Sequence, residues 1–148
     1  MSKLLIVAHA PLASALRAVA AHAFPERAAL VSAVDVTPDQ SEPETAVRQA
    51  LEALAGHDVL MLTDAFGATP CTACQRAAAG APRTRVITGV NVPMLWRTLG
   101  NPDLPLDELA QRALAGAVQG VMQANPTPRQ NQPSSRPGHD QVTHHDQQ

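Results

Sequence analysis

Short apolar runs alternate along the chain with longer stretches in which Leu, Val and Ala recur at helical spacing. The apolar runs are residues 3–8, 29–36, 58–64 and 83–90. The stretches between them, and two more after the fourth run, carry apolar residues three or four positions apart, as amphipathic helices do. Strands that alternate with helices at this spacing form mainly parallel sheets. The sequence therefore predicts an α/β fold that is doubly wound, with a mainly parallel four-stranded sheet and helices on both faces.

Local signals predict where several of these elements begin and end. Pro11 suits a first helical turn, where a missing N–H costs nothing. Residues 41–44, Ser-Glu-Pro-Glu, are typical of a capping box before a helix that Gly56 ends. Asn91 precedes a further helix as an ordinary N-cap. Residues 120–123, Gly-Val-Met-Gln, predict a short closing strand.

The composition narrows the classes of function. The chain has 148 residues, which suits one domain whose core needs neither disulfides nor metals. Aromatic residues make up only 2% of the chain, so Ala, Val, Leu and Ile must form the core. The formal net charge of -2 offers no general attraction to nucleic acid or anionic lipid. We therefore expect no nucleic-acid partner.

The two ends of the chain differ in character from its middle. The N-terminal residues loosely resemble a secretory signal, but His9 and Pro11 interrupt the apolar run and Arg17 falls where it should continue. No stretch approaches the roughly 20 apolar residues of a membrane span. We therefore expect a cytoplasmic protein without membrane insertion. Residues 1–124 should form the domain, and residues 125–148, rich in Pro, Gln and Ser, should be a disordered tail.

Two ionisable side chains follow neighbouring strands of the predicted sheet. His9 comes after the first apolar run and Asp64 ends the third. The first and third strands of a doubly wound sheet are commonly neighbours, and such sheets carry their sites outside the carboxyl ends of the strands. A carboxylate that holds one imidazole nitrogen leaves the other free to react. Either residue alone would be an ordinary loop residue or turn cap, so their joint placement carries the hypothesis.

The same end of the sheet offers groups that favour an anion. Two predicted helices begin there, near Pro11 and near Pro70, with free N–H groups and the positive ends of their dipoles. Thr69 is placed as an N-cap, or its hydroxyl could contact a bound phosphoryl group. A histidine nucleophile, an orienting acid and an anion cradle fit phosphoryl transfer through phosphohistidine, without requiring it.

The pair Cys71 and Cys74 leaves a second class of function open. A C-x-x-C at a helix start resembles a thiol–disulfide redox site, although here it follows the third strand rather than the first. Cys also serves as a small apolar residue in tight packing. A zinc site would need two more ligands, for which the tail histidines are the only loose supply. We expect no metal and no cofactor.

Three segments together resemble one known family. They are LLIVAHAPLASAL, LMLTDAFGATPCTAC and VITGVNVPMLWRTL. In this order they are similar to the IIA component of the bacterial sugar phosphotransferase system (PTS), mannose/fructose/sorbose family, over about residues 3–124. The resemblance implies phosphorylation of His9, an orienting role for Asp64, and a phosphoryl-binding loop at Gly67, Ala68 and Thr69.

The resemblance also implies partners. A phosphoryl group would come from the phosphohistidine of the carrier protein HPr and pass to a IIB component, without metal or nucleotide. No IIB domain follows in this sequence, so IIB would act in trans, or the protein would be a purely regulatory binding module. Association with a membrane IIC/IID complex is a further expectation. The chain departs from the family at Ala68, where a second Gly is frequent, and at Ala10 and Pro11, where Gly or Ser is common.

A dimer is expected from the end of the predicted domain. The segment at residues 120–123 is too short to add a stable strand by itself. The helix before it has Leu106, Leu109, Ala113 and Ala117 on one side, an apolar face that one small sheet would not cover fully. Pairing the strand with a neighbouring subunit would satisfy its backbone groups. Together with the resemblance, this predicts a homodimer with an exchanged, short antiparallel edge strand.

Overall fold

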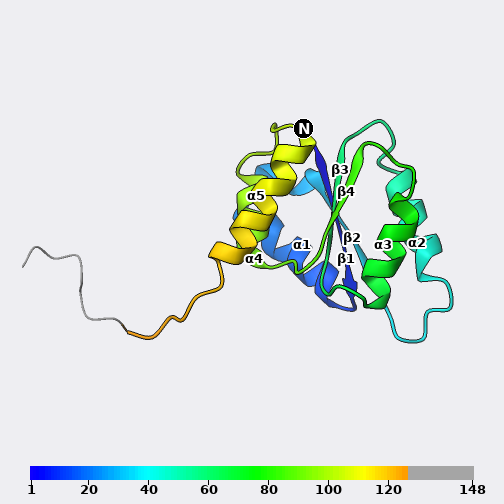
Figure 1. Cartoon of the computed structure of the whole chain (residues 1–148), viewed down its shortest axis with the longest axis horizontal. Helices are drawn as coiled ribbons and strands as arrows, with labels where there is room; N and C mark the ends of the chain where they lie inside the picture. The colour runs from blue at the N-terminus through cyan, green and yellow to red at the C-terminus, as the bar shows by residue number, and fades with distance from the viewer. Residues whose placement is uncertain (127–148) are drawn as a thin grey trace, which may run out of the picture.

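The computed structural model describes residues 1–126, and the remaining residues of the expected tail lie outside the described part (Figure 1). Helices and strands alternate from the N-terminus onward. Their bounds are β1 Lys3–His9, α1 Leu12–Ala23, the 3-10 helix η1 Pro25–Leu30, β2 Val31–Val36, α2 Pro43–Glu52, β3 Val59–Thr63, α3 Thr69–Ala78, β4 Thr84–Ile87, α4 Val92–Leu99 and α5 Leu106–Gln119.

The four strands form one sheet in the order β2-β1-β3-β4, and every pairing is parallel. This confirms the predicted α/β fold with a four-stranded parallel sheet. The two central strands are β1 and β3, as the doubly wound arrangement requires, with Val7 opposite Thr63. The next residue of β3 along the chain is Asp64, and His9 ends β1. The topology thus places the two predicted site residues on adjacent loops.

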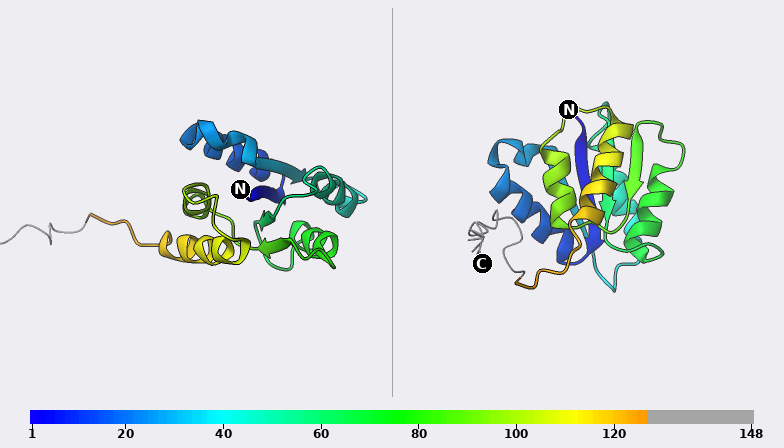
Figure 2. Two further views of the ribbon diagram at one scale, coloured as in Figure 1. Left: turned by 90° about the horizontal axis from the view of Figure 1, so that it is seen from above. Right: turned by 60° about the vertical axis from the view of Figure 1, so that its left-hand side comes forward.

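Helices cover both faces of the sheet, as Figures 1 and 2 show. One apolar cluster joins the sheet to α1, α4 and α5, and the other joins it to α2 and α3. Along β1, Leu4 and Ile6 belong to the first cluster, whereas Leu5 and Val7 belong to the second. Because both faces are covered, the strand is a continuous apolar run rather than an alternating one.

The start of α2 differs from the sequence prediction. The predicted capping box at residues 41–44 does not form, since the helix begins at Pro43 and no side chain caps it. The carboxylate of Glu44, which a capping box would turn back onto the backbone, instead accepts hydrogen bonds from Arg48 at 2.7 and 3.0 Å. An ion pair four residues along the same helix has replaced the cap.

The predicted antiparallel edge strand at residues 120–123 is not formed in the described chain. The helix α5 continues to Gln119, and residues 121–126 adopt no regular structure. Val121 and Met122 are 77% and 73% exposed, and the segment pairs with neither edge strand, β2 or β4, of its own sheet. The expectation of an uncovered α5 face was also wrong for Leu106, Leu109 and Ala113, because all three are buried under the subunit's own sheet.

None of the helices in residues 1–126 has the length and apolar character needed to cross a lipid bilayer.

Candidate functional site

His9 and Asp64 meet at the carboxyl end of the sheet. The Nδ1 atom of His9 lies 2.6 Å from Oδ2 of Asp64, and the backbone N–H of His9 donates to the same oxygen at 3.0 Å. The His9 side chain is 55% exposed, whereas the Asp64 side chain is 13% exposed. The carboxylate therefore contacts one nitrogen of the ring, Nδ1. The other nitrogen, Nε2, belongs to an exposed ring and can meet another molecule.

The surroundings of Asp64 keep it ionised. Burial by itself would raise the pKa of this carboxyl group. Hydrogen bonds from the backbone and the ring of His9, together with the charge of His9, outweigh burial and lower the pKa below its usual value. The second oxygen, Oδ1, accepts from the backbone N–H of Ala65 at 3.0 Å. Both oxygens thus have defined partners, which fixes the orientation of the carboxylate.

The loop after β4 supports the backbone on which Asp64 sits. The N–H of Gly89 donates to the carbonyl oxygen of Asp64 at 3.2 Å, and the N–H of Val90 donates to that of Thr63 at 3.0 Å. Gly89 has φ +76°, a conformation that other residues rarely adopt. This glycine therefore allows the tight turn that holds the end of β3.

The loop from Asp64 into α3 carries the residues expected to bind a phosphoryl group. Gly67 turns the chain with φ +81°, and Ala68 occupies the N-cap position. Thr69 is the first residue of the helix rather than its cap, contrary to the prediction, and its side chain makes no capping bond. The predicted N-cap of α4 does form, because Oδ1 of Asn91 accepts from the N–H of Met94 at 3.0 Å.

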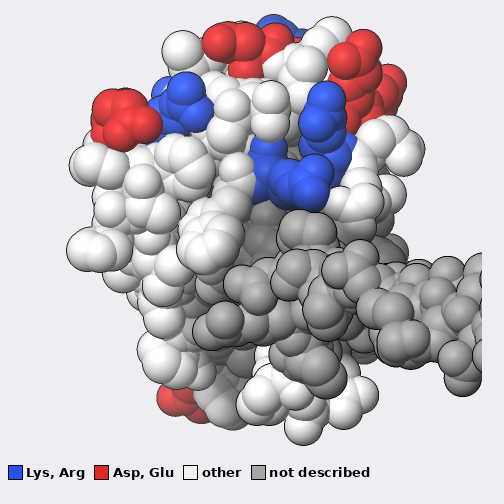
Figure 3. Space-filling view, turned by 90° about the vertical axis from the view of Figure 1, so that its left-hand side faces the viewer, with Lys and Arg blue, Asp and Glu red and all other residues white. Residues whose placement is uncertain are grey.

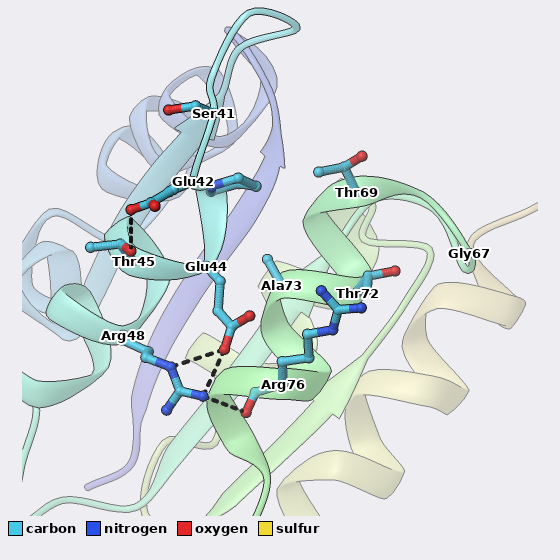
Figure 4. Close-up of a pocket in the computed structure, with 11 residues that line it drawn as sticks. Ser41, Glu42, Glu44, Thr45, Arg48, Gly67, Thr69, Thr72, Ala73 and Arg76 are labelled. Atoms are coloured by element: carbon cyan, nitrogen blue, oxygen red, sulfur yellow. Dashed lines mark hydrogen bonds and ion pairs between the residues drawn. The ribbon is translucent and has the colours of Figure 1, made fainter.

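A cleft of about 550 Å³ opens between α2 and α3, next to this loop (Figure 4). Gly67, Thr69 and Thr72 lie on its α3 side. On the α2 side, Arg48 pairs with Glu44 and also donates to the carbonyl oxygen of Arg76 at 3.3 Å. His9 does not line the cleft. The cleft therefore adjoins the loop from Asp64 into α3 without including the histidine.

The structure reveals one residue that the sequence analysis missed. Asp35, near the end of β2, accepts a hydrogen bond from the backbone N–H of Ser14 at 3.1 Å through Oδ1. Its Oδ2 atom accepts from the Ser14 hydroxyl. A carboxylate thus occupies the first turn of α1, one of the two helix starts expected to bind an anion. The only local signal was a serine early in α1, which does not reveal a partner from another strand.

The two cysteines lie inside the protein. Cys71 and Cys74 are both fully buried in α3, on the side that packs against the sheet. Burial raises the pKa of the Cys74 thiol to about 12, with Cys71 and Asp64 contributing further in the same direction. A reactive thiol needs exposure and a lowered pKa, so these features disfavour thiol–disulfide catalysis. Within residues 1–126, no three His, Cys, Asp or Glu side chains come together as a metal site.

Comparison with known proteins gives a family that agrees with this geometry. The family described as "PTS system fructose IIA component" matches residues 3–111. The chain belongs to the PTS IIA family of the mannose/fructose/sorbose type. It is thus a IIA component of the sugar phosphotransferase system, in a family of phosphotransfer proteins. No protein of curated function matches the sequence significantly.

Solved structures of this family share the fold. The mannose/sorbose-specific IIA subunit from Enterococcus faecalis is 23% identical with a TM-score of 0.79, over 86% of this chain and 97% of that one. The EIIA component from Streptococcus agalactiae is 22% identical with a TM-score of 0.72, over 83% and 97%. A putative phosphoenolpyruvate-dependent PTS permease from Klebsiella pneumoniae is 18% identical with a TM-score of 0.65, over 82% and 90%. At these identities the likeness concerns the fold alone.

Proposed function

We propose that this IIA component is a phosphocarrier that accepts a phosphoryl group from phospho-HPr on His9 and passes it to a IIB component on another chain. The observation that carries the proposal is the 2.6 Å contact between Nδ1 of His9 and Oδ2 of Asp64. It leaves Nε2 as the reactive atom of a ring that is 55% exposed. An exposed nucleophile is what transfer between two proteins requires, because the donor must reach the ring.

During the transfer step, each of the two histidine rings keeps a proton on the nitrogen that does not react. In the reacting form of the His9 ring, Nε2 has a free lone pair and the proton is on Nδ1, from which it is donated to Asp64. The Nε2 lone pair forms a new N–P bond while the N–P bond of the donor phosphohistidine breaks, and that electron pair returns to the donor ring. The donor ring, protonated on its other nitrogen, leaves as neutral imidazole. The His9 ring becomes a phosphoimidazolium cation, whose charge the Asp64 carboxylate stabilises.

The start of α3 is the proposed cradle for the phosphoryl oxygens. This helix has no side-chain cap and no acidic residue in its first turn. Its free N–H groups and dipole favour an anion. Gly67 allows close approach of the backbone, Ala68 leaves the N-cap position without a competing oxygen, and the exposed Thr69 hydroxyl can donate to a phosphoryl oxygen. No metal or cofactor takes part in this scheme.

The wider setting follows from the same proposal. The PTS IIA domain spans residues 1–124 and works in the cytoplasm, where it can associate with a membrane IIC/IID complex. It forms a homodimer in which residues 120–123 pair with the sheet edge of the partner subunit. Support comes from the exposed apolar side chains Val118, Val121 and Met122. On the side where α4 and α5 lie, the visible Lys, Arg, Asp and Glu side chains gather mostly towards the upper end (Figure 3).

Reconstitution tests the phosphocarrier function. The protein is incubated with enzyme I, HPr and labelled phosphoenolpyruvate, and the label it takes up should be acid-labile and base-stable. His9→Ala should remove this label while the circular dichroism spectrum stays unchanged. A His9→Ala protein labelled at the wild-type rate would contradict the assignment. Sedimentation of the full chain and of a chain cut after Gln119 tests the dimer: the first should be dimeric and the second monomeric or unstable.

A further inference from the structure

The loop that carries Asp64 also displays the most exposed aromatic side chain of the protein. Phe66 is 79% exposed and stands between Asp64 and the turn at Gly67. The whole chain has two Phe, one Trp and no Tyr, so aromatic side chains are scarce. The other phenylalanine, Phe24, is partly buried against the core and lies under Arg27. Within residues 1–126, Phe66 belongs to neither apolar cluster and has no such packing.

The loop that carries His9 is apolar and exposed as well. Ala10 and Pro11 are exposed, and Leu12, the first residue of α1, is 39% exposed. The 2.6 Å contact between His9 and Asp64 ties this loop to the one that bears Phe66. The exposed histidine ring is therefore flanked along the chain, on both loops, by apolar residues that are exposed in the single subunit.

We propose that Phe66 is the side chain on which the phosphoryl donor, phospho-HPr, docks. Direct transfer requires the donor ring to come within a few ångströms of Nε2 of His9, so the donor must cover the surface around His9. A specific interface buries about 800 Å² on each partner, equivalent to a disc of roughly 16 Å radius. Two residues span at most about 7 Å, which keeps Phe66 close to Asp64 and well inside that disc. The donor must therefore meet this ring with apolar surface of its own.

The proposal assigns Phe66 to recognition and not to the chemical step. Exposed aromatic side chains that become buried at the centre of an interface account for much of its affinity. Phe66 contacts neither His9 nor Asp64 by any hydrogen bond, so its removal leaves the reacting atoms in place. Truncation should raise the KM for phospho-HPr about tenfold or more, and kcat at saturating donor should change little.

The inference rests on the proposed phosphocarrier function, and two donors separate the two. Initial rates of His9 phosphorylation are measured for wild type and Phe66→Ala, first with phospho-HPr and then with phosphoramidate, a small phosphoryl donor that needs no docking surface. We expect the loss with phospho-HPr alone. Phe66→Leu should recover part of the rate because it restores apolar area. Trp96→Ala removes a half-exposed aromatic side chain on α4 and should keep the wild-type KM.

Each other outcome overturns the inference in a distinct way. An unchanged KM for phospho-HPr in Phe66→Ala, with normal labelling of wild type, would refute the docking role and leave the phosphocarrier function standing. Equal losses with both donors would show that Phe66 supports the site itself. If wild type sediments as a dimer and Phe66→Ala as a monomer, a second copy of the chain, and not the donor, covers the Phe66 ring. Failure of wild type to accept label from either donor would refute the phosphocarrier function and the inference with it.

Discussion

Two helices, α1 and α3, begin directly after the two loops that hold the site, yet their first turns differ. In α1, the N–H and hydroxyl of Ser14 donate to the carboxylate of Asp35 from β2. In α3, Ala68 at the N-cap position offers no side-chain oxygen, and no side chain caps the helix. A carboxylate of the protein therefore occupies the positive end of α1, whereas no side chain caps the positive end of α3.

The difference shows how the fold separates stability from function. A capped helix start typically stabilises a protein by about 1 kcal/mol. The chain uses this gain at α1 through Asp35 and at α4 through Asn91. It forgoes the gain at α3, the helix that follows Asp64. Free N–H groups at that start favour an anion, and in the proposed function they bind the phosphoryl group carried by His9.

The largest expected effect comes from removing the carboxylate that both loops share. Asp64→Asn should slow label uptake from phospho-HPr by about 10²-fold or more, because the amide no longer fixes the Nδ1–H tautomer or stabilises the phosphoimidazolium. The fold should survive, as judged by circular dichroism. The kinetics are measured at saturating donor. A rate equal to that of wild type would mean that Asp64 only shapes the turn.

A second variant gives α3 the kind of cap that α1 already has. In Ala68→Asp, the new carboxylate can accept from the N–H of Cys71 and add about 1 kcal/mol to the free energy of unfolding. It should also slow phosphorylation of His9 by about tenfold or more, because a fixed negative charge competes with the phosphoryl oxygens. Ala68→Ser is the matched uncharged control and should lose less activity. A stabilised Ala68→Asp protein with full activity would contradict the cradle at α3.

The reverse change frees the start of α1. Asp35→Ala should lower the free energy of unfolding by about 1 kcal/mol, since Ser14 loses its partner. Label uptake should stay within about threefold of wild type, because α1 is not the phosphoryl cradle in this account. Urea unfolding and uptake kinetics on the same preparation measure both effects. A loss of activity without a loss of stability would place the phosphoryl group at α1 instead.

The smallest expected effect is a pH dependence of stability. The folded state lowers the pKa of Asp64 below its ordinary value of 3.8. The stability that this carboxylate provides is therefore present above that value and is lost as the pH falls through the lower, folded-state pKa. The difference in unfolding free energy between wild type and Asp64→Asn should be constant near neutral pH and shrink in acid. A difference that grows as the pH falls below 4 would have the wrong sign.

The parts of the fold that sequence patterns predicted are those fixed by local and repeating signals. The apolar runs predicted β1 and β3. The usual strand order of a doubly wound sheet then predicted that His9 lies beside Asp64. The contact of Asp35 with Ser14 was not predictable in this way, because it depends on the pairing of β2 with β1 and on where α1 lies over that pair. Likewise, the short helix η1 has no apolar periodicity that would predict it. Its Arg27 donates a hydrogen bond to the carbonyl oxygen of Leu99, a residue distant in the sequence.

Two segments do not form, in the single subunit, the local structure that their sequences predict. Glu44 could complete a capping box or pair with Arg48 one turn later, and the structure shows the pair. The segment at residues 120–123 has strand-forming residues, but in the single subunit it pairs with neither edge strand of the sheet, β2 or β4. At each of these segments the residue types suit the predicted structure, and the structure that forms depends on which partner is within reach.

We propose that Asp64 holds Nδ1 of His9 so that Nε2 receives the phosphoryl group. Phosphorus NMR of the protein after reaction with enzyme I, HPr and phosphoenolpyruvate tests this directly, because phosphohistidines substituted on Nδ1 and on Nε2 give different resonances. We expect a single phosphohistidine signal of the Nε2 type that disappears in His9→Ala. A signal of the Nδ1 type, or a phosphohistidine signal that persists in His9→Ala, would contradict it.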